Sequence, residues 1–270
     1  MLFGFGFSPS KAERVVNITY DADAQTFFTN AGITDTTQKN AVNQLVLDLK
    51  SYNIWTKMKA IYPMVGGTST THKYNLKDPR DLDAAFRLSF STGWTHSSNG
   101  ALPGGTAFAN TFLNTATNLS INSGHLSYYS RTDQASGVIA EIGSLKSLPD
   151  SFSDIQLKSG SGAIVRFNNT TAFNSAANTN STGFYIGSRT ASNVIKMYKN
   201  GSVLVNGTAS SNATSTVNFY IGAQNNNGTA QSYSQKQCAF ASLGDGLTDA
   251  EASNFNTAVQ AFNTTLGRNV

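Results

Sequence analysis

Hydrophobic and polar positions alternate in short segments along most of the chain, which is the pattern of strands with one buried and one exposed face. Between about residues 60 and 246, these segments are separated by Gly, Asn, Ser and Thr, which favour turns. Many short strands with turn residues between them are typical of an antiparallel sandwich. The predicted strands are residues 85–90, 125–130, 138–142, 163–167, 184–188, 194–198, 202–205, 219–222 and 237–243.

The clearest local signal is a predicted hairpin around Asn200 and Gly201. These two residues separate the alternating segments 195–199 and 202–205. Asn and Gly both tolerate positive φ, so the pair predicts a two-residue type I′ turn.

A first helix is predicted from about residue 35 to 52. Thr34 or Asp35 can cap its first turn, and Gln38 stands three residues after Asp35, a weak capping-box pattern. We expect this helix to pack on the body or against a neighbouring subunit. Its apolar stripe consists of Val42, Leu45, Val46 and Leu49.

A final helix is predicted over residues 248–267. Thr248 and Glu251 have the spacing of a capping box, and Gly267 stands where a helix commonly ends on a glycine. The buried stripe consists of Phe255, Ala258, Val259, Phe262 and Leu266. These elements divide the chain into an arm (1–33), a helical linker (34–59) and a sandwich that includes the final helix (60–270).

The arm begins with Phe3, Phe5 and Phe7, which alternate with glycine. In an extended segment their three rings would share one face. Residues 15–20 are rich in β-branched and aromatic residues and predict a short strand. Two interpretations of residues 1–33 stay open. They form a terminus without fixed structure, or an anchor whose rings dock on another protein, because clustered exposed aromatics mark interaction sites.

Charge is sparse, at 13% of residues with a net charge of +4. The basic residues are dispersed apart from a cluster between Lys50 and Arg87 that also contains aspartates, so we expect no nucleic-acid partner. No apolar run reaches the roughly 18 residues of a membrane span. The first residues also lack the basic region and cleavage site of a secretion signal. We therefore expect no membrane partner and no ordinary secretion.

Catalytic carboxylates are scarce. Glycoside hydrolysis needs two carboxyl groups about 5–10 Å apart, and the chain has only three glutamates. Glu13 lies in the arm, Glu141 stands alone in a predicted strand, and Glu251 caps the final helix. There is no G-x-S-x-G motif, and the histidines lack zinc-site spacing. The sequence therefore predicts a protein that is not an enzyme and needs no cofactor.

The densest acidic cluster lies between Asp78 and Asp83. Asp81 and Asp83 would share one face of an extended segment, where their oxygens could bind calcium. The neighbouring Arg80 and Arg87 favour salt bridges instead. The regular D-x-D-x-D-G calcium loop is absent, so we expect no metal site, with calcium as the weaker alternative.

Several aromatic residues are candidates for contact with sugar rings. In the pair Tyr128-Tyr129, one ring must point outward if the strand has one exposed face. Trp94 begins the polar segment 94–100, which we interpret as a contact loop. The candidate glycan-contact residues are Trp94, Tyr128, Tyr129 and Arg131.

Segments 125–131, 184–200 and 239–268 resemble laminin-G-like, concanavalin A-like jelly-roll domains. The region from about Asn17 also resembles structural proteins of tailed bacteriophages, mainly through residues 34–57 and 73–87. The resemblance implies a mainly β jelly-roll, an antiparallel sandwich with an N-terminal and a C-terminal helix. It also implies a place in a fibre, spike or decoration of the phage head or tail. Sugar-binding or metal residues of such domains cannot be matched one by one.

Three functions follow from these observations. The leading hypothesis is a non-enzymatic virion structural protein that is made in the host cytoplasm and displayed on the particle. We expect it to be a homo-oligomer, for example a trimer. It would bind other virion proteins through Phe3, Phe5 and Phe7. The second is a glycan-binding adhesion module for host-surface polysaccharide. The third is a polysaccharide depolymerase, against which the shortage of glutamates argues.

Overall fold

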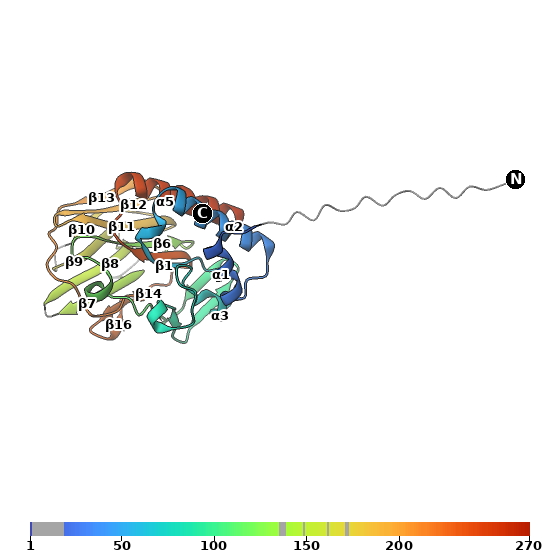
Figure 1. Ribbon diagram of the computed structural model, residues 1–270. Helices are drawn as coiled ribbons and strands as arrows, with labels where there is room; N and C mark the ends of the chain where they lie inside the picture. The colour runs from blue at the N-terminus through green and yellow to red at the C-terminus, as the bar shows by residue number, and fades with distance from the viewer. Residues whose placement is uncertain (2–18, 135–138, 148, 161, 171–172) are drawn as a thin grey trace.

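Two β-sheets packed face to face form the body of the protein, and a layer of helices covers the outer side of one sheet (Figure 1). The computed structural model describes Met1 and residues 19–134, 139–147, 149–160, 162–170 and 173–270. Residues 15–18 of the strand predicted over 15–20, and the rings of Phe3, Phe5 and Phe7, lie outside these described residues, so both stay predictions. Thr19 and Tyr20, the described end of that predicted strand, are not in a strand.

The first sheet has eight strands within the described residues, and all of its pairs are antiparallel. Seven of the strands follow one another in a single order, and β1 pairs with β17 outside that order. In spatial order the strands are β13 (Ser202–Gly207), β12 (Val194–Lys199), β11 (Gly183–Ala191), β6 (Gly124–Ser130), β17 (Cys238–Gly244), β4 (Gly100–Pro103) and β3 (Trp94–Ser97), with β1 (Met58–Tyr62).

The second sheet has nine strands in the described part of the chain, and β15 runs parallel to β7 while the other pairs are antiparallel. The strands of the main path, in order, are β10 (Asn174–Ala177), β9 (Gly162–Asn169), β8 (Asp150–Ser159), β7 (Ile142–Ser147), β14 (Tyr220–Ile221), β5 (Ala109–Asn110) and β2 (Ser89–Phe90); the hairpin of β15 (Gln224–Asn226) and β16 (Thr229–Gln231) pairs with β7.

The helices gather mainly over the first sheet, where α2 and α5 lie side by side (Figure 1). They are α1 (Ala22–Ala31), α2 (Thr36–Ser51), α3 (Ser69–His72), α4 (Thr115–Asn118) and α5 (Asp249–Thr265), with short 3-10 turns at Trp55–Lys57 and Asp83–Ala85. The expected fold, an antiparallel sandwich with an N-terminal and a C-terminal helix, is confirmed.

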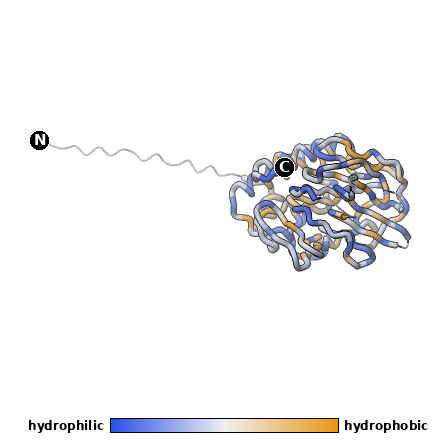
Figure 2. The backbone as a smooth tube through the Cα atoms, turned by 180° about the vertical axis from the view of Figure 1, so that it is seen from behind, coloured by the Kyte–Doolittle hydropathy of each residue, from blue (hydrophilic) through white to orange (hydrophobic). Residues whose placement is uncertain are grey.

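The first sheet is buried on both faces, because it separates two hydrophobic cores. One core lies between the sheets and includes Tyr128 and Tyr185; the other lies under the helices and includes Tyr129 and Phe184. Adjacent residues of one strand therefore point into different cores, as the period of two requires. Figure 2 shows the resulting mixture of hydrophobic and hydrophilic stretches along the backbone of the body.

Most strand predictions are confirmed, and three hold only in part, two of them because the backbone turns. Of residues 85–90 only Ser89 and Phe90 are in a strand, because a 3-10 turn ends at Ala85 and Phe86 has a φ of 58°. Of residues 139–142, the described part of the strand predicted over 138–142, Ile142 alone is in a strand. In 219–222 the strand β14 ends at Ile221, because Gly222 has a φ of 84° and redirects the chain. The predicted hairpin is confirmed, with φ of 48° at Asn200 and 81° at Gly201.

Both predicted helices are confirmed, but α1 lies in the segment that the sequence pattern assigned to the arm. Its Phe27 and Phe28 are buried in the core that also includes α2. Asp21 caps the helix and Gly32 ends it with a φ of 69°, and these two residues are the local signal for it. In α2, Asp35 caps as expected, but Gln38 does not complete a capping box: its Oε1 accepts a hydrogen bond from the Gly66 amide.

The interior also holds charged groups that the sequence did not reveal. Glu141 and Lys236 form a fully buried ion pair with 2.9 Å between Oε1 and Nζ. Glu141 also accepts hydrogen bonds from the Leu157 amide and the Ser234 hydroxyl. A buried pair whose carboxylate also accepts two further hydrogen bonds fixes the arrangement of the strands that carry it, because breaking it leaves an unpaired charge.

Removing one partner of this pair should destabilise the fold strongly. Lys236→Met leaves the Glu141 carboxylate buried without its cation, which should lower the free energy of unfolding by about 3–5 kcal/mol. The double variant Lys236→Met/Glu141→Gln keeps an acceptor for the Leu157 amide and should recover part of that loss. Urea unfolding monitored by circular dichroism measures both. Equal losses in the single and double variants would show that the two charges are not coupled.

A second prediction concerns acid. The buried ring of His125 donates from Nδ1 to the Asp245 carbonyl (2.7 Å) and accepts from the Ser242 hydroxyl (3.0 Å). Burial lowers the pKa of His125 to about 4. The folded state therefore favours the neutral ring, so the stability that His125 contributes is fully present above the ordinary pKa of 6.5 and is lost as pH falls towards 4.

Between those values, stability should fall by up to about 1.4 kcal/mol per pH unit because of this ring. His125→Gln should have a shallower dependence over the same window, whatever its absolute stability. Urea unfolding of both proteins at several pH values across that window gives the two slopes. Parallel slopes would contradict the assignment.

Candidate binding groove

The N-terminal turn of α5 is fixed against the first sheet by polar contacts. Thr248 and Glu251 form the predicted capping box, and Glu251 also pairs with Lys57 at 2.6 Å. The Ser188 hydroxyl on β11 donates to the Leu247 carbonyl and accepts from the Leu247 amide, each at 2.8 Å. These contacts place the start of α5 directly beside strands β11 and β12.

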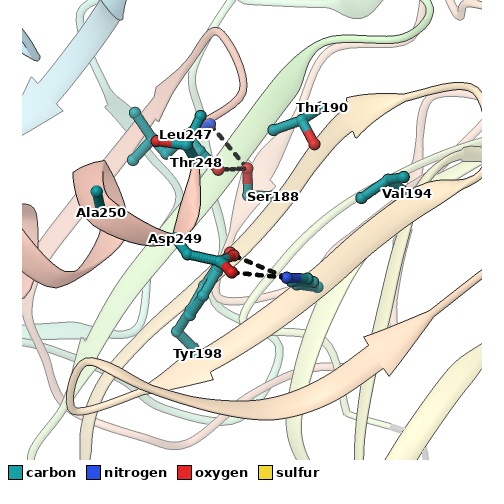
Figure 3. A pocket seen from close by; sticks show the side chains of 9 residues that line it. Ser188, Thr190, Val194, Tyr198, Leu247, Thr248, Asp249 and Ala250 are labelled. Carbon is teal, nitrogen blue, oxygen red and sulfur yellow. Dashed lines mark hydrogen bonds and ion pairs between the residues drawn. The ribbon is translucent and has the colours of Figure 1, made fainter.

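A groove of about 330 Å³ runs between the start of α5 and the outer face of β11 and β12 (Figure 3). The strands supply one side and the end of the loop before α5 with the first helical turn supplies the other. The lining residues are Ser188, Thr190, Val194, Lys196, Tyr198, Leu247, Thr248, Asp249 and Ala250.

Asp249 is the polar centre of the groove. Its Oδ1 accepts hydrogen bonds from Lys196 Nζ (2.8 Å) and the Tyr198 hydroxyl (2.6 Å), and its Oδ2 accepts from Lys196 Nζ (2.9 Å) (Figure 3). Hydrogen bonds from Lys196 and then Tyr198 hold the pKa of Asp249 below its ordinary value. Burial raises the pKa of Tyr198, so its hydroxyl stays protonated and donates. The Asp249 side chain is nevertheless 65% exposed, and solvent reaches it directly.

The groove therefore offers three kinds of contact. A carboxylate accepts, an ammonium donates, and the hydroxyls of Thr190 and Thr248 do either. Val194 and Ala250 add apolar surface, whereas Leu247 is fully buried behind them. Such a lining suits a small polar ligand that carries both hydroxyl groups and C–H surfaces.

Two of the predicted glycan-contact residues are wrong. Tyr128 and Tyr129 are both fully buried. The prediction that one ring points outward assumed a sheet with one face in water, whereas helices cover the outer face of this sheet. The Tyr129 ring packs against Phe184 beneath α5, and the Tyr128 hydroxyl donates to the Lys236 carbonyl.

Trp94 and Arg131 lie elsewhere and are engaged in internal contacts. The Trp94 indole donates to the Phe108 carbonyl (3.1 Å), and its ring packs on Phe90 and Gly222. Segment 94–100 forms the edge hairpin β3–β4 rather than an open loop. Arg131 donates to the Arg268 carbonyl and the Gln237 side chain. Neither residue lines the groove.

The acidic cluster forms salt bridges, as the basic neighbours of its aspartates predicted. Asp81 pairs with Lys73 and Arg87, and Asp83 pairs with Arg87. Over the described residues, no three or more His, Cys, Asp or Glu side chains come together as a metal site would need. Within the same residues, no helix is both long and apolar enough to cross a membrane.

Lys196, Thr190 and Asp249 are site residues that the sequence did not predict. In the sequence pattern, Asp249 belongs to a helix start and Lys196 to a hairpin, and the two are 53 positions apart. Only the docking of α5 on β12 brings them together, and no local pattern encodes that contact.

Comparisons with known proteins bear on the fold. No protein-family model matches the chain, and no curated protein matches it. Among solved structures, a sialidase from Trypanosoma rangeli, in complex with 2-keto-3-deoxy-D-glycero-D-galacto-2,3-difluoro-nononic acid, is similar with a TM-score of 0.55 and 9% identity. The match covers 81% of this chain and 39% of the sialidase, so the chain spans about two fifths of that protein's length.

Two further structures are more distant. Domain 4 of AbnA, an extracellular arabinanase from Geobacillus stearothermophilus, in complex with arabinotriose, has a TM-score of 0.47 and 11% identity over 74% of this chain and 98% of its own. The binding domain of botulinum neurotoxin serotype D has a TM-score of 0.46 and 10% identity over 76% and 52%. The sialidase likeness shows the fold, a concanavalin A-like sandwich. None of the three links the chain to a bacteriophage particle, so that part of the resemblance stays a prediction.

Proposed function

We propose that the protein is a non-catalytic glycan-binding module and that the groove beside α5 is its sugar-binding site. The observation that carries the proposal is the pair of partly buried Lys196 and exposed Asp249, set among hydroxyls and apolar side chains in one groove. Sugars present alternating hydroxyl and C–H surfaces, and such a lining matches both. The sialidase, of which 39% matches this chain, is named as a complex with a nonulosonic acid derivative, which is a sugar.

The absence of catalysis is part of the proposal, and the state of the carboxylates supports it. Glu141 is buried in an ion pair, and Glu251 is held in the capping box by Thr248 and by Lys57. Asp249 is the carboxylate in the groove, and the lining contains no second one among the described residues. Glycoside hydrolysis requires two carboxyl groups across the bond. A groove with one carboxylate suits binding better than depolymerisation.

Binding without a cofactor is also proposed. Asp81 and Asp83, the weaker calcium candidates, are already paired with Lys73 and Arg87. Chelation of calcium should therefore leave glycan binding unchanged. Display on a virion surface, by an arm carrying Phe3, Phe5 and Phe7, stays a prediction. Binding of a host-surface polysaccharide agrees with it.

The proposal predicts that blocking the groove abolishes glycan binding. The purified, labelled chain should bind a subset of glycans on an array, equally with and without a calcium chelator. Thr190→Trp places a large ring in the groove from an exposed strand position. The ring should exclude the sugar and weaken that binding at least about tenfold, which corresponds to about 1.4 kcal/mol of binding free energy.

Thr229→Trp is the matched control, because Thr229 is an exposed strand threonine on the β15–β16 hairpin of the other sheet. Its binding should equal that of the wild type. Retained binding in Thr190→Trp would move the site elsewhere. An array without any bound glycan would overturn the proposed function.

A further inference from the structure

We propose that the groove selects uncharged sugar units by recognising two adjacent hydroxyl groups with Asp249 and Lys196. The inference rests on the proposed glycan-binding function and specifies the ligand class of the same groove. It follows from the hydrogen-bonding sites on these two side chains that no described residue occupies.

Asp249 has one acceptor site left. Each carboxylate oxygen accepts about two hydrogen bonds. Oδ1 already accepts from Lys196 and Tyr198, whereas Oδ2, among the described residues, accepts from Lys196 alone. The second site of Oδ2 is therefore available to a ligand hydroxyl that donates.

The Lys196 ammonium has one hydrogen left to donate, next to this acceptor site. An ammonium carries three hydrogens, and the described hydrogen bonds of Nζ go to the two oxygens of Asp249. The unused donor and the unused acceptor sit on atoms 2.9 Å apart. Hydroxyl oxygens on neighbouring carbons of a sugar ring have a similar spacing when they are gauche. One hydroxyl can then donate to Oδ2 while its neighbour accepts from Nζ.

The apolar part of the groove supports this mode over ring stacking. The ring of Tyr198 is 2% exposed and packs in the core under the helices. It therefore presents its hydroxyl to Asp249 rather than its face to a ligand. Val194 and Ala250 offer only small aliphatic surfaces, and Leu247 is fully buried. Recognition consequently depends on the hydroxyl pair, and the C–H groups of the sugar add only van der Waals contacts.

The charge balance of the groove selects against acidic sugars. Lys196 and Asp249 are the charged side chains of its lining, and their charges cancel. A sugar carboxylate that approached Lys196 would lie beside Asp249, and like charges this close disfavour each other's ionised form. Uronic or sialic acid units should therefore bind less well than neutral units with the same ring.

Tyr198 is a positioning residue in this scheme. Its hydroxyl occupies Oδ1 at 2.6 Å, which directs Oδ2 to the ligand. Loss of the hydroxyl leaves Oδ1 with the Lys196 ammonium alone, which holds the orientation of the carboxylate less firmly. Tyr198→Phe should therefore reduce selectivity while the buried ring continues to support the fold.

The test uses matched polymers. Glucan, mannan and galactan, and the same polymers oxidised at C6 to uronates, are immobilised. Binding of the 270-residue chain is measured by biolayer interferometry at fixed ionic strength. At least one neutral polymer should bind about tenfold more tightly than its uronate form, equivalent to about 1.4 kcal/mol. Equal or tighter binding of the uronate form overturns the inference but leaves the proposed function standing. No binding to any polymer, neutral or oxidised, overturns both.

Variants tie the selectivity to the residues. Asp249→Asn keeps the side-chain shape but removes the negative charge, so the neutral-to-uronate ratio should fall from about ten to about one. Tyr198→Phe should lower the ratio as well. Asp83→Asn is the matched control, because Asp83 is an exposed carboxylate in a salt bridge outside the groove, and its ratio should equal the wild-type value. A ratio unchanged in Asp249→Asn would overturn the assignment of Asp249.

Discussion

Burial of the first sheet on both faces is the constraint on which the rest of the structure depends. A sheet of eight strands must hide its apolar outer side, and among the described residues α1, α2 and α5 provide the cover. Phe184 and Phe240 on the strands meet Phe255 of α5 in edge-to-face contacts. Such contacts add to the free energy gained by burying the rings. The helical layer is therefore part of the core, and the groove is the place where that layer ends and the sheet becomes exposed.

Much of the fold could be predicted from local sequence, because the responsible signals are local. The Asn200-Gly201 turn, the Thr248–Glu251 capping box and the strand alternation each act within a few residues. Features that depend on contacts between distant segments could not be predicted from the sequence. Whether Tyr129 faces water depends on a helix more than a hundred residues later, and the period of two cannot reveal that. The same holds for Lys236, whose partner Glu141 lies 95 positions away.

Site residues were harder to predict than elements for a related reason. Aromatic residues are natural candidates for glycan contacts because sugars often stack on rings, yet here the rings are needed to fill two cores. The proposed site instead relies on Lys196 and Asp249, whose types are ordinary on any surface. Their significance comes from being placed 2.8 Å apart by the docking of α5 and from the hydroxyl of Tyr198. No residue type or spacing in the sequence marks this arrangement.

Two buried arginines show how the interior tolerates charge without counterions. Arg189 and Arg268 form no salt bridge within the described chain, and their guanidinium groups donate mainly to backbone carbonyls. Arg268 in particular binds the carbonyls of Pro63, Met64 and Ala239, so one side chain ties the segment after α5 to two separate parts of the sandwich.

The two hydrogen bonds between the Ser188 hydroxyl and the Leu247 backbone would couple ligand binding to the docking of α5. Because the groove has one side on β11–β12 and the other on the start of α5, it exists only while that helix is docked. Any molecule that occupies it binds the docked state and not the undocked one, and mass action then shifts the equilibrium towards docking. Release of α5 would expose Phe184 and Phe240 to water. A ligand in the proposed site would therefore protect the protein against local opening, and with it against aggregation through the uncovered sheet.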